Sequence, residues 1–133
     1  MFNWPLLREF ARSHEKRPLV TIAAVITRYD ADEQDDEGAL HQIIAVRVTD
    51  VVEVPRGVVV AQGDEVRVII RYGDSQGLPE RIADPTLGEP IEVCGVFIPA
   101  ESAYTRPDEA PMDLIHFTHR PLGWVKYRGR TYR

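Results

Sequence analysis

The feature that most constrains the fold is a series of segments rich in β-branched residues, separated by stretches of glycine, proline and acidic residues. These segments occupy residues 19–29, 41–54, 65–72, 91–99 and 112–119, and residues 123–132 form a closing segment or short hairpin. Valine, isoleucine and threonine favour strands, and turn-forming residues mark where strands end. Helices do not alternate regularly with these segments, so a doubly wound parallel sheet is not predicted.

One helix is predicted ahead of the strands, over residues 3–16. Asn3 can cap its first turn through the side-chain oxygen. Leu6, Leu7 and Phe10 fall on one face at helical spacing. We therefore expect this helix to pack on the domain or to bridge two subunits.

The length of 133 residues predicts a single domain, with residues 1–17 as an N-terminal helix and residues 18–133 as a β-structure. Short, uneven strands joined by long loops are typical of a small Greek-key barrel. An all-β, OB-like barrel with one N-terminal helix is the predicted fold. A β-sandwich is the alternative.

Cysteine content and hydropathy bear on the compartment. The single cysteine, Cys94, excludes an internal disulfide, and its apolar neighbours predict a core position. The N-terminal apolar run is broken by Arg8 and Glu9, unlike a signal peptide. No stretch approaches the ~20 apolar residues of a membrane-spanning helix. These observations predict a cytoplasmic protein without a membrane partner.

Charge is unevenly distributed along the chain, whose formal net charge is -5. Residues 30–38 contain six carboxylates, whereas residues 120–133 contain five cations and no acid. A binder of duplex DNA usually has a basic overall charge. A basic segment of this kind can still attract an anionic ligand locally.

Aromatic and basic residues alternate near the C-terminus, and OB-folds bind single strands by stacking bases on aromatics beside cations. We therefore predict a non-enzymatic module that binds single-stranded nucleic acid or another anionic ligand. Phe117 and Trp124 would stack on bases, and the cations would meet phosphates. The predicted ligand-binding residues are His41, Gln42, His116, Phe117, Thr118, His119, Arg120, Trp124, Lys126, Arg128 and Arg130.

An enzyme is the first alternative, with His41, His116 and His119 as zinc ligands or as the acid–base groups of a hydrolase. In an extended strand, positions 116 and 119 point to opposite faces. They converge only if the strand ends or bulges at Thr118. No cofactor is therefore predicted, and zinc is kept as the alternative.

A catalytic signature also occurs in residues 73–77, GDSQG, which match the nucleophile-elbow pattern around Ser75. That pattern needs a helix directly after the serine, whereas Leu78 and Pro79 follow here, so a loop is predicted.

The second alternative function is that of a structural or partner-binding protein. In this interpretation the N-terminal helix, residues 3–16, is the contact of a homodimer.

The pairing of His41 with Gln42, the strand GEPIEVCGVF, and the segment IHFTHRPLGWVKYRGRTY together resemble a family of small uncharacterised bacterial proteins. The resemblance covers residues 19–54 and 88–132 and implies an OB-like barrel, with no established activity. The positions that match the family signature are His41, Gln42, His116, Thr118, His119, Gly123, Trp124 and Tyr132. Phe117 and Arg120 stand where the family usually has tryptophan and histidine, which weakens a histidine-rich metal site.

Overall fold

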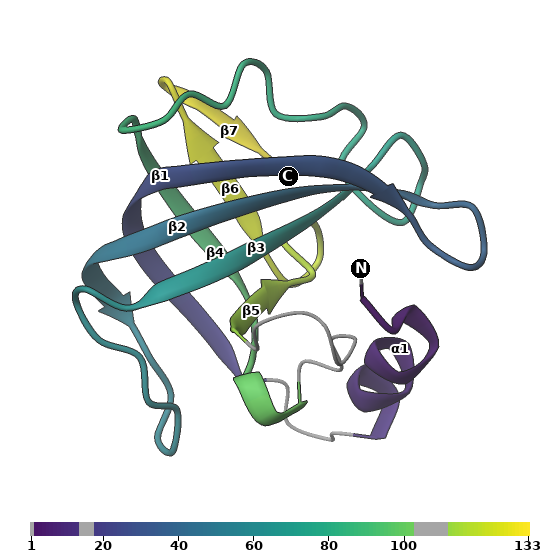
Figure 1. The fold of residues 1–133 in the computed structure, drawn as a ribbon, viewed down its shortest axis with the longest axis horizontal. Coiled ribbons are helices and arrows are strands. Elements are labelled where there is room, and N and C mark those ends of the chain that lie inside the picture. The colour runs from purple at the N-terminus through teal and green to yellow at the C-terminus, as the bar shows by residue number, and fades with distance from the viewer. Residues whose placement is uncertain (1, 14–17, 103–111) are drawn as a thin grey trace.

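The computed structural model of the chain describes residues 2–13, 18–102 and 112–133 (Figure 1). Its elements are α1 (Trp4–Ser13), β1 (Leu19–Gln34), β2 (Leu40–Glu53), β3 (Glu65–Tyr72), β4 (Pro90–Ile98), a 3-10 turn (Ala100–Ser102), β5 (Asp113–His116), β6 (Trp124–Tyr127) and β7 (Arg130–Tyr132). The described part of the chain contains no helix with the length and apolar character needed to cross a membrane.

The predicted N-terminal helix is present, and its first turn is capped as expected. The amide of Leu6 donates to Oδ1 of Asn3 over 3.4 Å, and the amide of Leu7 donates to the Asn3 carbonyl over 3.1 Å. The predicted helix positions 14–16 lie outside the described residues, as do positions 103–111 of the loop expected before β5.

Five strands close into a barrel, in the order β1-β2-β3-β5-β4, with β4 pairing back to β1. The β3–β5 pair is parallel, and the remaining pairs are antiparallel. This closure confirms the predicted all-β, OB-like barrel with one helix, and it excludes the alternative of two stacked sheets.

The first strand is longer than predicted, because it continues through the acidic residues to Gln34. The prediction of a solvated loop over residues 30–38 is therefore wrong for its first half. β2 supplies backbone partners along this extension, as in the pair Glu33–His41. Register shifts along β1 mark bulges, which let one long strand bend around the barrel.

Alternation along the strands creates two separate apolar clusters. Side chains such as Ile44, Val68 and Ile115 fill the barrel interior. The residues adjacent to these in the chain face outwards. Three of them, Ile43, Ile69 and Leu114, form a second cluster beneath Phe2, Trp4 and Leu7. Thus α1 lies outside the barrel, on the face formed by β2, β3 and β5 (Figure 1).

The β6–β7 hairpin closes one side of the barrel with tyrosines. Tyr127 and Tyr132 belong to the interior cluster. The Tyr127 hydroxyl donates to the Asp84 carbonyl over 2.9 Å, and it accepts from the Thr86 amide over 3.0 Å. These two tyrosines therefore close this side of the barrel, while Trp124 is half-buried on the outer side.

The fifth strand ends at His116, three residues earlier than predicted. Phe117 has a φ of 56°, which turns the chain out of the strand. The carbonyl of His119 then accepts from the amides of Leu122 and Gly123, over 3.1 and 2.8 Å. A Cβ atom at Gly123 would lie 2.1 Å from the Cys94 carbonyl oxygen, so only glycine fits this return to β4.

Candidate functional site

The residues predicted to bind a ligand fall into three places in the structure. His41, His116, Phe117, His119 and Arg120 line one pocket. Trp124, Lys126, Arg128 and Arg130 lie on the β6–β7 hairpin. Gln42 and Thr118 are fully buried, and each bonds to the backbone of another element.

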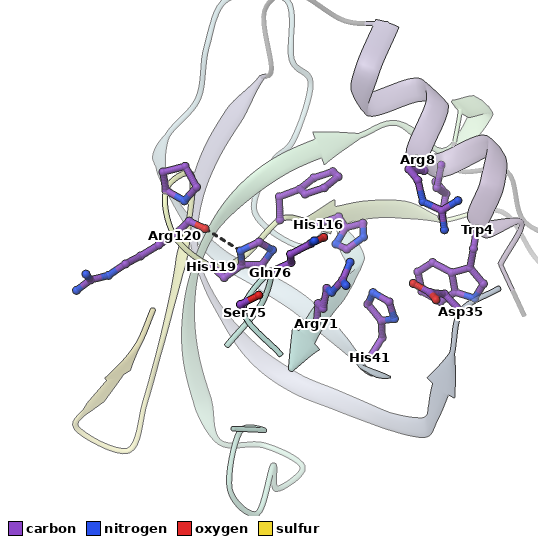
Figure 2. A pocket seen from close by; sticks show the side chains of 13 residues that line it. Trp4, Arg8, Asp35, His41, Arg71, Ser75, Gln76, His116, His119 and Arg120 are labelled. Carbon is purple, nitrogen blue, oxygen red and sulfur yellow. Dashed lines mark hydrogen bonds between the residues drawn. The ribbon is translucent and has the colours of Figure 1, made fainter. Parts of the chain in front are cut away.

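The pocket has a volume of about 370 Å³ and lies between α1 and the barrel (Figure 2). Its walls come from α1, the β1–β2 loop, β2, the end of β3 with the loop that follows, and the segment after β5. The lining residues are Trp4, Leu7, Arg8, Asp35, His41, Arg71, Ser75, Gln76, His116, Phe117, His119, Arg120 and Pro121. This volume is in the range of pockets that bind small molecules.

An unbroken series of ring contacts runs along the pocket. Trp4 stacks on His41, with centroids 4.3 Å apart and an interplanar angle of 20°. His41 meets His116 edge-on at 5.6 Å. His116 then stacks on Phe117 at 4.3 Å and 20°, and Phe117 meets His119 edge-on at 6.5 Å.

His116 and His119 line the same pocket, so the expectation that strand parity separates them is wrong. The reason is the end of β5 at His116 and the left-handed conformation of Phe117, which return His119 to the side where His116 lies. Convergence was predicted to need a break near Thr118, and the break occurs one to two residues earlier.

Burial keeps the three imidazoles uncharged at neutral pH. The pKa of His41 is lowered to about 4, chiefly by burial; Asp35 opposes this change and the nearby Arg71 guanidinium contributes to it. Burial also lowers the pKa of His116 well below 6.5 and lowers the pKa of His119. Each neutral ring offers one N–H donor and one nitrogen acceptor.

Three polar atoms in the aromatic series have no hydrogen-bond partner among the described residues. They are Nε1 of Trp4, Nδ1 of His41 and Nδ1 of His116, and all three are buried. Nδ1 of His119, by contrast, lies 2.8 Å from the Arg120 carbonyl oxygen.

The three histidines do not form a metal centre in this geometry. Within residues 2–13, 18–102 and 112–133, no group of three His, Cys, Asp or Glu side chains is placed to hold an ion. His41 and His116 meet edge-on, and Phe117 contacts both His116 and His119. The described residues therefore contain no set of ligands that matches the zinc hypothesis.

Cations surround the pocket in different environments. Arg8 pairs with Asp36 at 2.6 Å and with Glu37 at 2.9 Å, and Arg71 pairs with Asp74 at 2.8 Å. Arg120 is exposed, and Figure 2 shows its guanidinium pointing away from the histidines.

Gln42 is placed inside the barrel, where its side chain has a structural role. Its Nε2 donates to the Ile82 carbonyl over 3.1 Å, and its Oε1 accepts from the Ile82 amide over 2.7 Å. Strand parity separates it from His41, which faces outwards under Trp4. Gln42 therefore holds the β3–β4 loop against the barrel.

The hairpin residues form a second surface, in which each cation lies over a ring. Lys126 Nζ is 5.0 Å from the centroid of Trp124. Arg128 lies over Tyr127 at 5.1 Å and donates to Thr86 Oγ1, while Arg130 lies over Tyr132 at 4.4 Å and pairs with Glu80. Residues 117–123 connect this surface to the pocket along the chain.

Several pocket residues were not anticipated, chiefly Trp4 and Arg71. Arg71 is opposite His41 in the β2–β3 register, so a correct pairing of these two strands would have identified it. Trp4 carries no comparable signal, because which barrel face α1 covers is not encoded by its own periodicity. Ser75 lies at the pocket in an exposed loop, as its sequence context predicted.

Comparison of the sequence with protein-family models and with curated proteins finds no match to either.

Proposed function

We propose that this protein is a non-enzymatic, OB-like binding module for single-stranded nucleic acid or another extended anion that carries planar rings. The observation that carries the proposal is the aromatic series in the pocket, from Trp4 to His119, which is followed along the chain by exposed cations. Bases stack on such rings regardless of sequence, and each stacked base contributes about 1–3 kcal/mol.

The charges near the pocket suit the anionic part of such a ligand. Arg120 leaves the pocket toward solvent, and Lys126, Arg128 and Arg130 are exposed on the hairpin that follows. In this proposal the neutral imidazoles and Phe117 contact a ring, and these cations contact the backbone phosphates. Asp35 also lines the pocket, and Asp36 and Glu37 pair with Arg8, so these carboxylates would disfavour phosphates at the end of the pocket next to α1.

Titration with fluorescent single-stranded oligonucleotides tests the proposal. An oligonucleotide of about 12 nucleotides matches the site size of one OB barrel. We expect binding at ~50 mM salt that weakens steeply toward ~200 mM, because bound phosphates displace counterions. An uncharged analogue of the same sequence serves as the control. If the wild-type protein and variants that uncover the pocket all fail to bind at low salt, the proposal is refuted.

A further inference from the structure

The N-terminal segment covers the face of the barrel that OB-folds commonly use to bind ligands, which is the outer side of β2 and β3. Phe2, Trp4 and Leu7 pack there over Ile43 and Ile69. Trp4 is only 7% exposed and His41 only 2%. The ligand face and the α1 contact are therefore the same surface.

Trp4 contacts this face in the way a stacked base would. Its indole is nearly parallel to the His41 ring, at 4.3 Å and 20°, and its plane meets His116 edge-on at 6.3 Å. Parallel stacking on a planar side chain is how OB barrels hold single-stranded bases.

The contact with α1 is poorly matched in its polar groups. Nε1 of Trp4 and Nδ1 of both His41 and His116 are buried there without a partner in the described chain. Unpaired buried polar atoms are destabilising. Burial of apolar surface therefore holds α1 in place against this penalty, together with the exposed ion pairs of Arg8 to Asp36 and Glu37.

We propose that Trp4 occupies the position on His41 where a planar ring of the ligand binds. Helix α1 is then an intrachain competitor for the binding face. On binding, α1 moves away and a nucleobase takes the place of the indole on His41. The donors and acceptors on the edge of the base then reach the two Nδ1 atoms. This inference rests on the function proposed above, and it places one base at a defined residue.

Two variants test whether α1 competes with ligand, using the fluorescent oligonucleotide at low salt. Trp4→Ala removes the indole that covers His41. Arg8→Glu replaces the two ion pairs with Asp36 and Glu37 by repulsion between like charges. Both are expected to tighten binding at least about threefold, because the open state becomes more populated. The gain with Arg8→Glu is diagnostic, since replacing a cation by an anion would by itself weaken the binding of an anionic ligand.

Leu6→Ala is the matched control, because Leu6 is on the same helix and is 42% exposed. It should leave affinity unchanged. Arg8→Glu alters no core contact and so remains informative if Trp4→Ala does not fold. If the wild-type protein binds and neither folded variant binds more tightly, the competitor role is wrong and the proposed function stands. If the wild-type protein and the variants all fail to bind, both the proposed function and the competitor role of α1 are wrong.

Tryptophan fluorescence gives an independent readout, because the chain has two tryptophans. In a Trp124→Phe background, Trp4 is the only one, and a ring remains at position 124. Saturating oligonucleotide should shift the Trp4 emission to longer wavelength and increase its quenching by acrylamide, because the indole leaves its buried position on His41. An unchanged emission wavelength in the saturated complex would show that the ligand binds with Trp4 in place, which would overturn the inference.

Discussion

The side-chain amide of Gln42 forms two hydrogen bonds with the backbone of Ile82, 40 residues further along the chain. Both residues are fully buried. This pairing satisfies the backbone amide and carbonyl of Ile82, which lies in the β3–β4 loop and outside the strands. It therefore fixes the β3–β4 loop across one side of the barrel.

Replacement of Gln42 by alanine should destabilise the protein strongly. The change leaves two buried backbone groups of Ile82 without partners, and each unpaired group costs about 1–3 kcal/mol. We expect the free energy of unfolding in urea to fall by at least about 2 kcal/mol. Gln62→Ala, at an exposed turn position, is the control and should change it by less than about 0.5 kcal/mol. Equal losses in the two variants would contradict the role given to Gln42.

Stability should decrease as the pH falls from about 6.5 to 4. Burial lowers the pKa of His41 to about 4, so in this window the unfolded chain binds a proton that the folded chain does not. A pKa that is lower by one in the folded chain than in the unfolded chain corresponds to about 1.4 kcal/mol, so His41 accounts for a loss of up to about 3 kcal/mol. The pKa values of Asp36 and Asp74 are lowered from 3.8, so these carboxylates titrate below the window.

The variant His41→Phe isolates this effect, because it keeps a ring beneath Trp4 and removes the titrating group. Unfolding free energies measured in urea at several pH values should show a shallower slope than in the wild-type protein. The residual slope would report His116 and His119, whose pKa values burial also lowers. Identical slopes in the two proteins would show that His41 is not the titrating residue.

Phe117 should contribute to oligonucleotide binding through its ring. Phe117→Leu keeps apolar volume but removes the surface that stacks on His116 and faces the pocket. We expect affinity to fall by about 1–3 kcal/mol, which is the contribution of one base–aromatic stack. Fluorescence anisotropy measures the change, and circular dichroism checks that the fold is kept. Unaltered affinity would place the bound ring elsewhere.

Lys126 should act as a phosphate contact, and its removal should alter the salt dependence of binding. Lys126→Ala is expected to weaken binding of all sequences alike. It should also reduce the slope of log affinity against log salt by about 0.7, the value for one phosphate of a single strand. Arg56→Ala, on the exposed β2–β3 loop, removes the same charge at another site and should leave the slope unchanged. A similar reduction in both variants would indicate only a general effect of net charge.

The fold was largely predictable because strand signals are local. β-Branched runs bounded by turns predicted β3 at its observed bounds, and they predicted β2 and β4 to within one residue at each end. β1 exceeded its prediction because its acidic half is held by pairing with β2, which composition does not reveal. The short hairpin expected within residues 123–132 is present as β6 and β7, and Arg128 and Gly129 at its turn both have positive φ, as a two-residue hairpin requires.

The candidate site was less predictable, because its residues converge through backbone geometry and docking. His41, His116 and Phe117 were named from the sequence, and the pocket contains all three. The sequence offered no reason to place Trp4 against His41, because contacts between a helix and a distant strand follow from the packing of whole faces. Gln42 was predicted to contact ligand, yet its position inside the barrel gives its amide to Ile82.

The sequence by itself determined the position of most strands and the aromatic, basic character of the C-terminal segment, because β-branched runs and turn chemistry act over a few residues. Tertiary structure alone decided that α1 covers the outer face of β2, β3 and β5 and that His116 and His119 share a pocket. These features depend on the left-handed Phe117, on the close approach of Gly123 to Cys94 and on the fit of Trp4 over His41. Such contacts join residues far apart in the chain, and their energies are set only when the barrel has closed.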